Sequence, residues 1–227
     1  MNLLNAVKDN SLITIAFILL LASCTDMPSG SNANAAFVNQ VDSSIAIKNG
    51  SLPTTFDSTL TLFTDTSYKL KFHVFDTQNF NEEKSNSTVT FSHIKGYKAE
   101  RIFQDSFYCM SPLIEFQDFN NDGVKDILFF YYTGGRSNPT YHLYLVDTIN
   151  HKLTYVKGFE NLPNPDLDSA NNVISSSALY GTKVGFSFYR IDTNDKLINL
   201  GHSFETEFGD FTKYDKAIKQ IIKQRRR

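Results

Sequence analysis

Oxygen-bearing side chains recur at positions 1, 3, 5 and 9 of one short stretch, and they have the chemistry of a cation site. These residues are Asp118, Asn120, Asp122 and Asp126. Calcium takes six to eight oxygen ligands from carboxylates, amides and carbonyls, and the carbonyl of Val124 at position 7 would add one more. Gly123 gives the backbone the freedom for a sharp turn. The spacing therefore predicts one calcium ion (Ca2+) held by this loop.

The residues around this loop indicate strands on both sides. An EF-hand needs a bidentate Glu at position 12, where this chain has Phe129, and it needs a helix on each side. Residues 127–132 are instead an apolar and aromatic run of strand composition. The alternative to a metal site is a surface turn rich in Asp and Asn that binds no ion.

The rest of the chain predicts an all-β domain. Residues 68–74 alternate, so that Leu70 and Phe72 would face a core while Lys71 faces water. Further strands are expected at 59–63, 88–91, 97–103, 113–117, 127–133, 141–146, 153–156, 173–179, 184–191 and 197–208. Residues 76–87 and 158–172 are expected to be irregular loops. This spacing favours a small, irregular β-propeller-like array of antiparallel hairpins, with a β-sandwich as the alternative.

The periodicity changes near the end of the chain. Apolar residues then follow helical spacing at Tyr214, Ala217, Ile218, Ile221 and Ile222. They predict one helix over 211–224 that caps a sheet. A basic helix lying on a membrane surface is the alternative, because cations gather at the end of the chain.

The first 23 residues have the features of a signal peptide. The apolar run from Leu12 to Leu21 is too short to span a bilayer but suits a signal h-region. The sequence Leu-Ala-Ser-Cys that ends at Cys24 resembles a bacterial lipobox. It implies that Cys24 carries lipid, palmitate included, and that residues 24–36 tether a single domain, 37–227. We therefore expect a lipoprotein of the bacterial cell envelope, with its domain in the periplasm or at the cell surface. An ordinary signal peptide is the alternative.

The order of motifs over residues 88–205 resembles one family. A strand, the D-x-N-x-D-G-x-x-D loop and an aromatic strand are followed by Gly135, Asn138, and the Tyr141-to-Leu145 segment. This order is similar to that of calcium-loop bacterial β-propeller lipoproteins with FG-GAP/VCBS-like repeats. The resemblance extends to periplasmic immunity proteins that inhibit lysozyme-like peptidoglycan hydrolases. It implies a calcium-stabilised fold and a protein partner.

The residue types argue against catalysis and against nucleic-acid binding. The five histidines are scattered, at His73, His93, His142, His151 and His202. No nucleophile elbow, HExxH or paired zinc motif is present, so we expect no enzyme. A formal net charge of −2 with no basic face argues against nucleic acid. Cys109 lies among apolar residues and is expected to be a buried small hydrophobe.

These observations favour a membrane-tethered, calcium-binding module that binds a protein. The candidate contact surface is the loop from Gly134 to Tyr141, which offers Arg136, Asn138 and Tyr141. Arg and Tyr are favoured at the centres of interfaces. The alternatives are a carbohydrate-binding or structural envelope lipoprotein, in which these residues merely close a turn.

Overall fold

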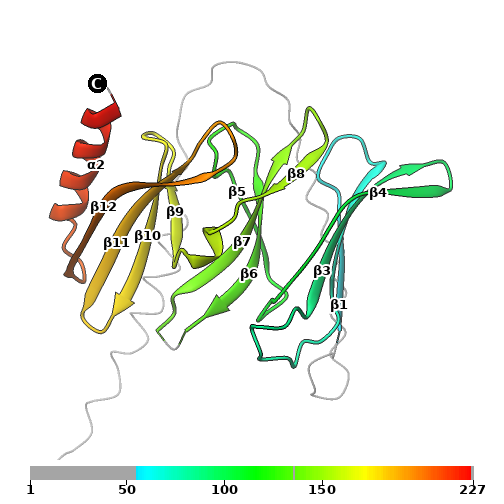
Figure 1. Cartoon of the computed structure of the whole chain (residues 1–227), viewed down its shortest axis with the longest axis horizontal. Coiled ribbons are helices and arrows are strands. Elements are labelled where there is room, and N and C mark those ends of the chain that lie inside the picture. The colour runs from blue at the N-terminus through cyan, green and yellow to red at the C-terminus, as the bar shows by residue number, and fades with distance from the viewer. Residues whose placement is uncertain (1–54, 135, 226–227) are drawn as a thin grey trace, which may run out of the picture. The chain divides into compact units, whose positions relative to one another are not determined.

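The computed structural model describes residues 55–134 and 136–225. Over these ranges the chain forms three four-stranded antiparallel sheets and a C-terminal helix, which confirms the all-β class (Figure 1). The N-terminal sheet holds β1 (Phe56–Leu60), β2 (Tyr68–Val74), β3 (Ser87–Lys95) and β4 (Lys98–Phe107). The middle sheet holds β5 (Ile114–Gln117), β6 (Asp126–Thr133), β7 (Pro139–Asp147) and β8 (Lys152–Tyr155). The C-terminal sheet holds β9 (Pro165–Asp168), β10 (Val173–Tyr180), β11 (Lys183–Ile191) and β12 (Leu197–Glu207).

Each sheet is a meander, because its strands pair in chain order. The middle sheet is covered on both faces, and this explains why the residues of β6 from Asp126 to Phe130 are all buried. On one face, Phe129 packs with Phe72 in a core shared with the N-terminal sheet. On the other, Leu128 packs with Ile174 in a core shared with the C-terminal sheet. The three sheets pack face to face in the order in which they occur along the chain. This arrangement fits the expected array of antiparallel hairpins and not the alternative of a sandwich, which has two sheets.

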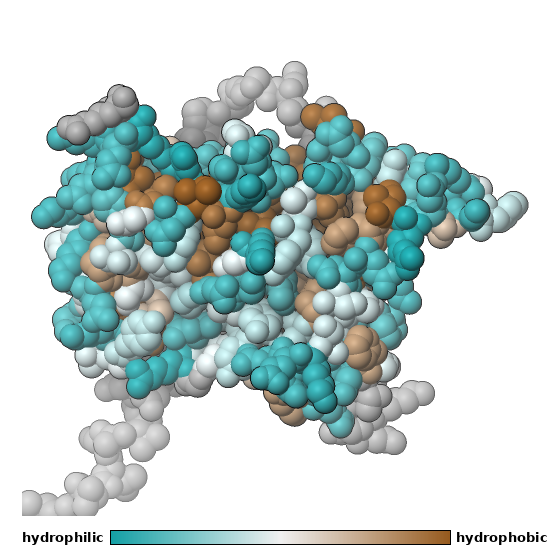
Figure 2. All heavy atoms as spheres, viewed as in Figure 1, coloured by the Kyte–Doolittle hydropathy of each residue, from teal (hydrophilic) through white to brown (hydrophobic). Residues whose placement is uncertain are grey.

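Helix α2 (Thr212–Arg225) confirms the predicted C-terminal helix, with each end one residue later than expected. Asp210 caps its start, since its Oδ1 accepts hydrogen bonds from the Thr212 amide at 3.0 Å and the Thr212 hydroxyl at 2.6 Å. Ile218 and Ile221 are buried with Phe188 against the C-terminal sheet. The helix therefore caps that sheet. Hydrophilic residues cover most of the molecular face that Figure 2 shows.

The sequence prediction was wrong in two places. Residues 158–172 are not wholly irregular, because they contain the short 3₁₀ helix η1 (Phe159–Asn161) and strand β9. Pro165 opens β9 and lacks an N–H donor, which an edge strand tolerates; β9 pairs with β10 alone. The first strand lies at Phe56–Leu60 rather than 59–63, with its inward side chains at alternate positions.

The expected signal peptide (1–23), Cys24 and the tether (24–36) lie outside the described residues. Within the described ranges, no helix combines the length and apolar character needed to cross a membrane. Cys109 is buried, and burial raises the pKa of its thiol to about 12. Its Sγ lies 2.8 Å from the Ser111 carbonyl oxygen, to which it donates. These findings confirm the expectation that Cys109 is a buried small residue.

Candidate calcium site and neighbouring surfaces

The candidate metal loop joins β5 to β6, as expected for a strand-to-strand loop. Pairing between the two strands ends at Gln117 and Asp126, so residues 118–125 form the connection. Two residues in the left-handed region curl it, Asn121 at φ 61° and Gly123 at φ 87°. A Cβ at Gly123 would meet nothing within 4 Å, so glycine serves the backbone angle there and not a close approach.

The side chains at loop positions 1, 3 and 5 organise the loop backbone. Asp118 accepts hydrogen bonds from the amides of Asn121 at 2.6 Å and Gly123 at 2.8 Å. Asp122 Oδ1 accepts from the Val124 amide at 2.7 Å, and its Oδ2 accepts from the Asn120 side-chain amide at 2.8 Å. An Asx-rich turn makes such contacts without a metal. Carboxylate oxygens accept more than one bond each, so these contacts leave lone pairs for a cation.

Asp126, at loop position 9, is wholly buried. Its Oδ2 accepts from the Phe119 amide at 2.8 Å and its Oδ1 from the Val146 amide on β7 at 3.1 Å. Burial raises the pKa of this carboxyl to about 7 against the two hydrogen bonds, and the charges of Asp122 and Asp118 raise it further. Asp126 therefore ties the loop to β7, and a cation nearby would favour its charged form.

The loop fits a hard cation by its donor chemistry. Its donors are the oxygens of Asp118, Asn120, Asp122 and Asp126 and the Val124 carbonyl, the ligand types that calcium takes. Across residues 55–134 and 136–225, however, no three His, Cys, Asp or Glu side chains gather as a metal-binding group. Binding an ion would therefore require the carboxylates of Asp118 and Asp122 to move toward a common point.

The three candidate partner-binding residues lie in one segment, but two of them have contacts within the fold. Asn138 Oδ1 accepts from the Leu179 amide at 2.9 Å and its Nδ2 donates to the Leu179 carbonyl at 3.3 Å, so it pairs with β10 much as a strand residue would. The Tyr141 hydroxyl donates to Glu115 at 3.0 Å, and burial, followed by the charge of Glu115, raises the pKa of that hydroxyl. Arg136 is exposed.

The tip of the β3–β4 hairpin, at Gly96 and Tyr97, is a more exposed surface. Pairing between β2 and β3 ends at Tyr68 and His93, while β3 and β4 stay paired as far as Lys95 and Lys98. The tip therefore projects past β2 (Figure 1). Gly96 adopts φ 62°, which suits a two-residue hairpin turn, and Tyr97 beside it is fully exposed.

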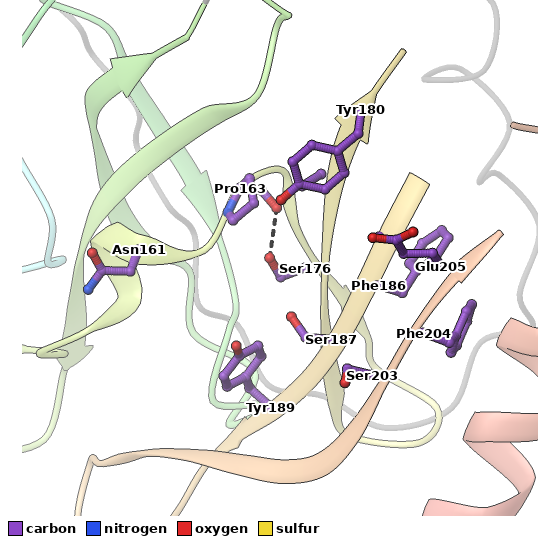
Figure 3. Close-up of a pocket in the computed structure, with 12 residues that line it drawn as sticks. Asn161, Pro163, Ser176, Tyr180, Phe186, Ser187, Tyr189, Ser203, Phe204 and Glu205 are labelled. Carbon is purple, nitrogen blue, oxygen red and sulfur yellow. Dashed lines mark hydrogen bonds between the residues drawn. The ribbon is translucent and has the colours of Figure 1, made fainter. Parts of the chain in front are cut away.

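The sequence did not predict a groove that lies on the C-terminal sheet. Its volume is about 370 Å³. Ser176, Ser187 and Ser203 lie in register across β10, β11 and β12 and line it. Figure 3 shows the three serines one after another across the strands, with the rings of Tyr180 and Tyr189 nearby.

The groove keeps open space because small residues lie where large ones would fill it. A Cβ at Gly185 would come 3.2 Å from Cε2 of Tyr180, so glycine lets that ring lie close to the sheet. Ser176 donates to the Pro163 carbonyl at 2.9 Å, and within the described ranges Ser187 and Ser203 use their hydroxyls in no hydrogen bond. The run of small residues from Ser175 to Ala178 in β10 and the alternate small residues Gly185 and Ser187 in β11 were the available signal in the sequence.

Comparison with known proteins adds no relative to this picture, since no known protein family, curated protein or solved structure matches the chain. The function is therefore inferred from the geometry of the candidate calcium loop, the β3–β4 hairpin tip and the serine groove.

Proposed function

We propose that the protein is a membrane-tethered, calcium-binding module of the bacterial cell envelope that binds and inhibits a peptidoglycan hydrolase. The observation that supports a protein partner most directly is the exposed Tyr97 at the tip of the β3–β4 hairpin. Tyrosine is enriched at the centres of protein interfaces, where its ring supplies contact area and its hydroxyl a hydrogen bond. A tip that projects past its own sheet can enter a cleft in another protein.

Strand pairing and one ion pair favour a single conformation of the hairpin. The Lys95 ammonium lies 2.7 Å from the Glu100 carboxylate across the two strands. Exposed pairs of this kind contribute little stability, but this one lies on the strands that flank Tyr97. Ile94 and Ile102 are also exposed on the same two strands. A hairpin held in one conformation loses less entropy on binding than a flexible loop does.

Calcium has a structural role in this proposal. The side chains of Asp118, Asn120, Asp122 and Asp126 and the carbonyl of Val124 would hold the ion, and the ion would offset the repulsion among their carboxylates. Because Asp126 also accepts from the Val146 amide, it transmits this order to β7. The proposed lipid on Cys24 would keep the domain beside the cell wall, where its partner acts.

A second candidate function, carbohydrate binding, is favoured by the serine groove. Unpaired hydroxyls on Ser187 and Ser203 both donate and accept, as sugar hydroxyls do. The rings of Tyr180 and Tyr189 offer flat apolar faces, and binding pockets combine such faces with a few polar groups. The carboxylate of Glu205 lines the same groove and adds an acceptor.

One pair of variants separates the two functions. The full chain, purified in mild detergent, is assayed for inhibition of a lysozyme-like hydrolase and for retention on peptidoglycan. Tyr97→Ala should weaken inhibition by about tenfold or more, the size of a good interface contact. Tyr180→Ala removes the same side chain from the groove and should leave inhibition unchanged. Equal inhibition by both variants would exclude the hairpin surface. Peptidoglycan retention lost in Tyr180→Ala, without hydrolase inhibition by the parent chain, would replace the first function by the second.

A further inference from the structure

Two arginines lie close together where the end of helix α2 meets the C-terminal sheet. Arg190 is on β11, and Arg225 ends α2. Both line a cavity of about 550 Å³, together with Gln224 and the apolar side chains of Leu200 and Ile221. Nothing in the calcium loop, the β3–β4 hairpin or the serine groove uses these residues.

Arg190 is half-buried, and its guanidinium forms no hydrogen bond or ion pair with any described residue. Its Nε is buried and has no hydrogen-bond partner among residues 55–134 and 136–225. The ion pairs among the described residues join Lys71, His73 and Lys95 to carboxylates, and none of them involves Arg190. A charged donor removed from water without a partner destabilises the fold. The side chain is therefore placed as if an acceptor were to fill the cavity beside it.

Arg225 is held next to this cavity by the backbone. Its Nη1 and Nη2 donate to the carbonyls of Asn171 and Asn172 at 2.5 Å and 2.7 Å. These bonds fix the plane of the guanidinium and leave further N–H donors for another acceptor, because arginine has five. Burial lowers the pKa of Arg225, and the positive charge of Arg190 lowers it further. The two like charges are thus near enough to repel each other, and no carboxylate among the described residues forms an ion pair with either.

We propose that Arg190 and Arg225 form a binding site for a tetrahedral oxyanion, a phosphate group. Arginine forks match the oxygens of phosphate and bind them with strong, charge-assisted hydrogen bonds. The anion would give Arg190 Nε its missing acceptor and would remove the repulsion between the two guanidinium groups. The side-chain amide of Gln224, whose Oε1 lies 3.4 Å from His202 Nε2, can add a donor through its nitrogen. This inference stands apart from the proposed hydrolase partner and from calcium.

The same phosphate chemistry has two sources, free phosphate and the phosphodiester of a lipid headgroup. The test is isothermal titration calorimetry of the full chain with two soluble probes, inorganic phosphate and glycerophosphoglycerol, the second being a headgroup without acyl chains. Saturable binding of inorganic phosphate alone assigns the site to the free ion. Saturable binding of both probes, with the diester the tighter, assigns it to a headgroup.

Three variants show whether the site is the one proposed. Arg190→Gln should weaken binding about tenfold or more, and Arg190→Lys should also weaken it because lysine lacks the planar fork. Lys183→Gln is the control, since it removes one exposed positive charge from the same strand away from the cavity. Phosphate should raise the melting temperature of the parent chain and of Lys183→Gln but not that of Arg190→Gln. The proposal is overturned if neither probe saturates, or if Lys183→Gln weakens binding as much as Arg190→Gln does.

Discussion

The protonation of Asp126 connects calcium, pH and stability in a way that can be measured. Its pKa rises from 3.8, the ordinary value, to about 7 in the fold. Between these two values the folded state holds a proton that the unfolded state has released. Without a cation, the stability that this group contributes is therefore fully present below pH 3.8 and is lost as pH rises through 7. A shift of about three units corresponds to about 4 kcal/mol at 1.36 kcal/mol per unit.

Calcium should reverse this loss, because the ion favours the charged form of its ligands. We expect the free energy of urea unfolding in chelator to fall by up to about 4 kcal/mol between pH 4 and pH 8. With saturating calcium the fall should be much smaller, so the stabilisation by calcium grows with pH. The chain has no Trp whose fluorescence could report unfolding. Circular dichroism can follow the loss of the β-sheet signal instead.

Asp126→Asn isolates this effect from other groups. Asparagine keeps an oxygen for the Val146 amide but does not titrate, so the curve of this variant in chelator should lack the fall attributed to Asp126. His142 is also buried, and its pKa is lowered, chiefly by burial, so its contribution to stability is lost as pH falls. Because His142 is present in both the parent and Asp126→Asn, its effect cancels when the two stability curves are subtracted. Asp215→Asn, at an exposed helix position, should behave as the parent. The reasoning is refuted if the parent and Asp126→Asn show the same pH dependence, or if calcium stabilises equally at pH 5 and pH 8.

Three further predictions concern other parts of the chain. Asn138→Ala should lower the free energy of unfolding by about 2–3 kcal/mol, because it removes both hydrogen bonds to Leu179. The control Arg136→Ala, at an exposed position, should change it by less than about 0.5 kcal/mol. Equal urea midpoints for the two variants would contradict this. Cys109 should resist a thiol reagent at pH 8 in the folded protein and react once urea unfolds it, since burial keeps its thiol protonated; fast native labelling would be inconsistent with that burial. Cys24→Ser should move the protein out of the membrane fraction, and unchanged fractionation would argue against lipidation there.

The alternation of apolar side chains predicted most of the strands. Leu70 and Phe72 alternate with polar residues and are buried as expected, because one face of β2 meets the core. The helical spacing of Ile218 and Ile221 likewise predicted α2. The start of the first strand was misplaced because Leu62 and Phe63 are buried without being in a strand, so their hydrophobicity resembled a continuation of it.

The site could be predicted only where its residues are close together in the sequence. The spacing of Asp118, Asn120 and Asp122 indicated the loop, but the hydrogen bond that the Val146 amide donates to Asp126 joins residues 20 positions apart. The pairing of Asn138 with Leu179 spans 41 positions, so the local sequence did not reveal this contact between the segment before β7 and β10. The serine groove and the arginine pair arise from strand register and helix packing, which the local sequence does not reveal.

The most direct test of the central claim is calorimetric titration of the full chain with calcium, beside Asp122→Asn. Asparagine keeps the acceptor for the Val124 amide but removes one charge from the loop. We predict one ion per chain, with a dissociation constant on the order of 10⁻⁴ to 10⁻³ M, as in extracellular modules, and binding weakened about tenfold or more in the variant. Heats that never saturate, or a variant that binds calcium as tightly as the parent, would contradict a calcium site in this loop.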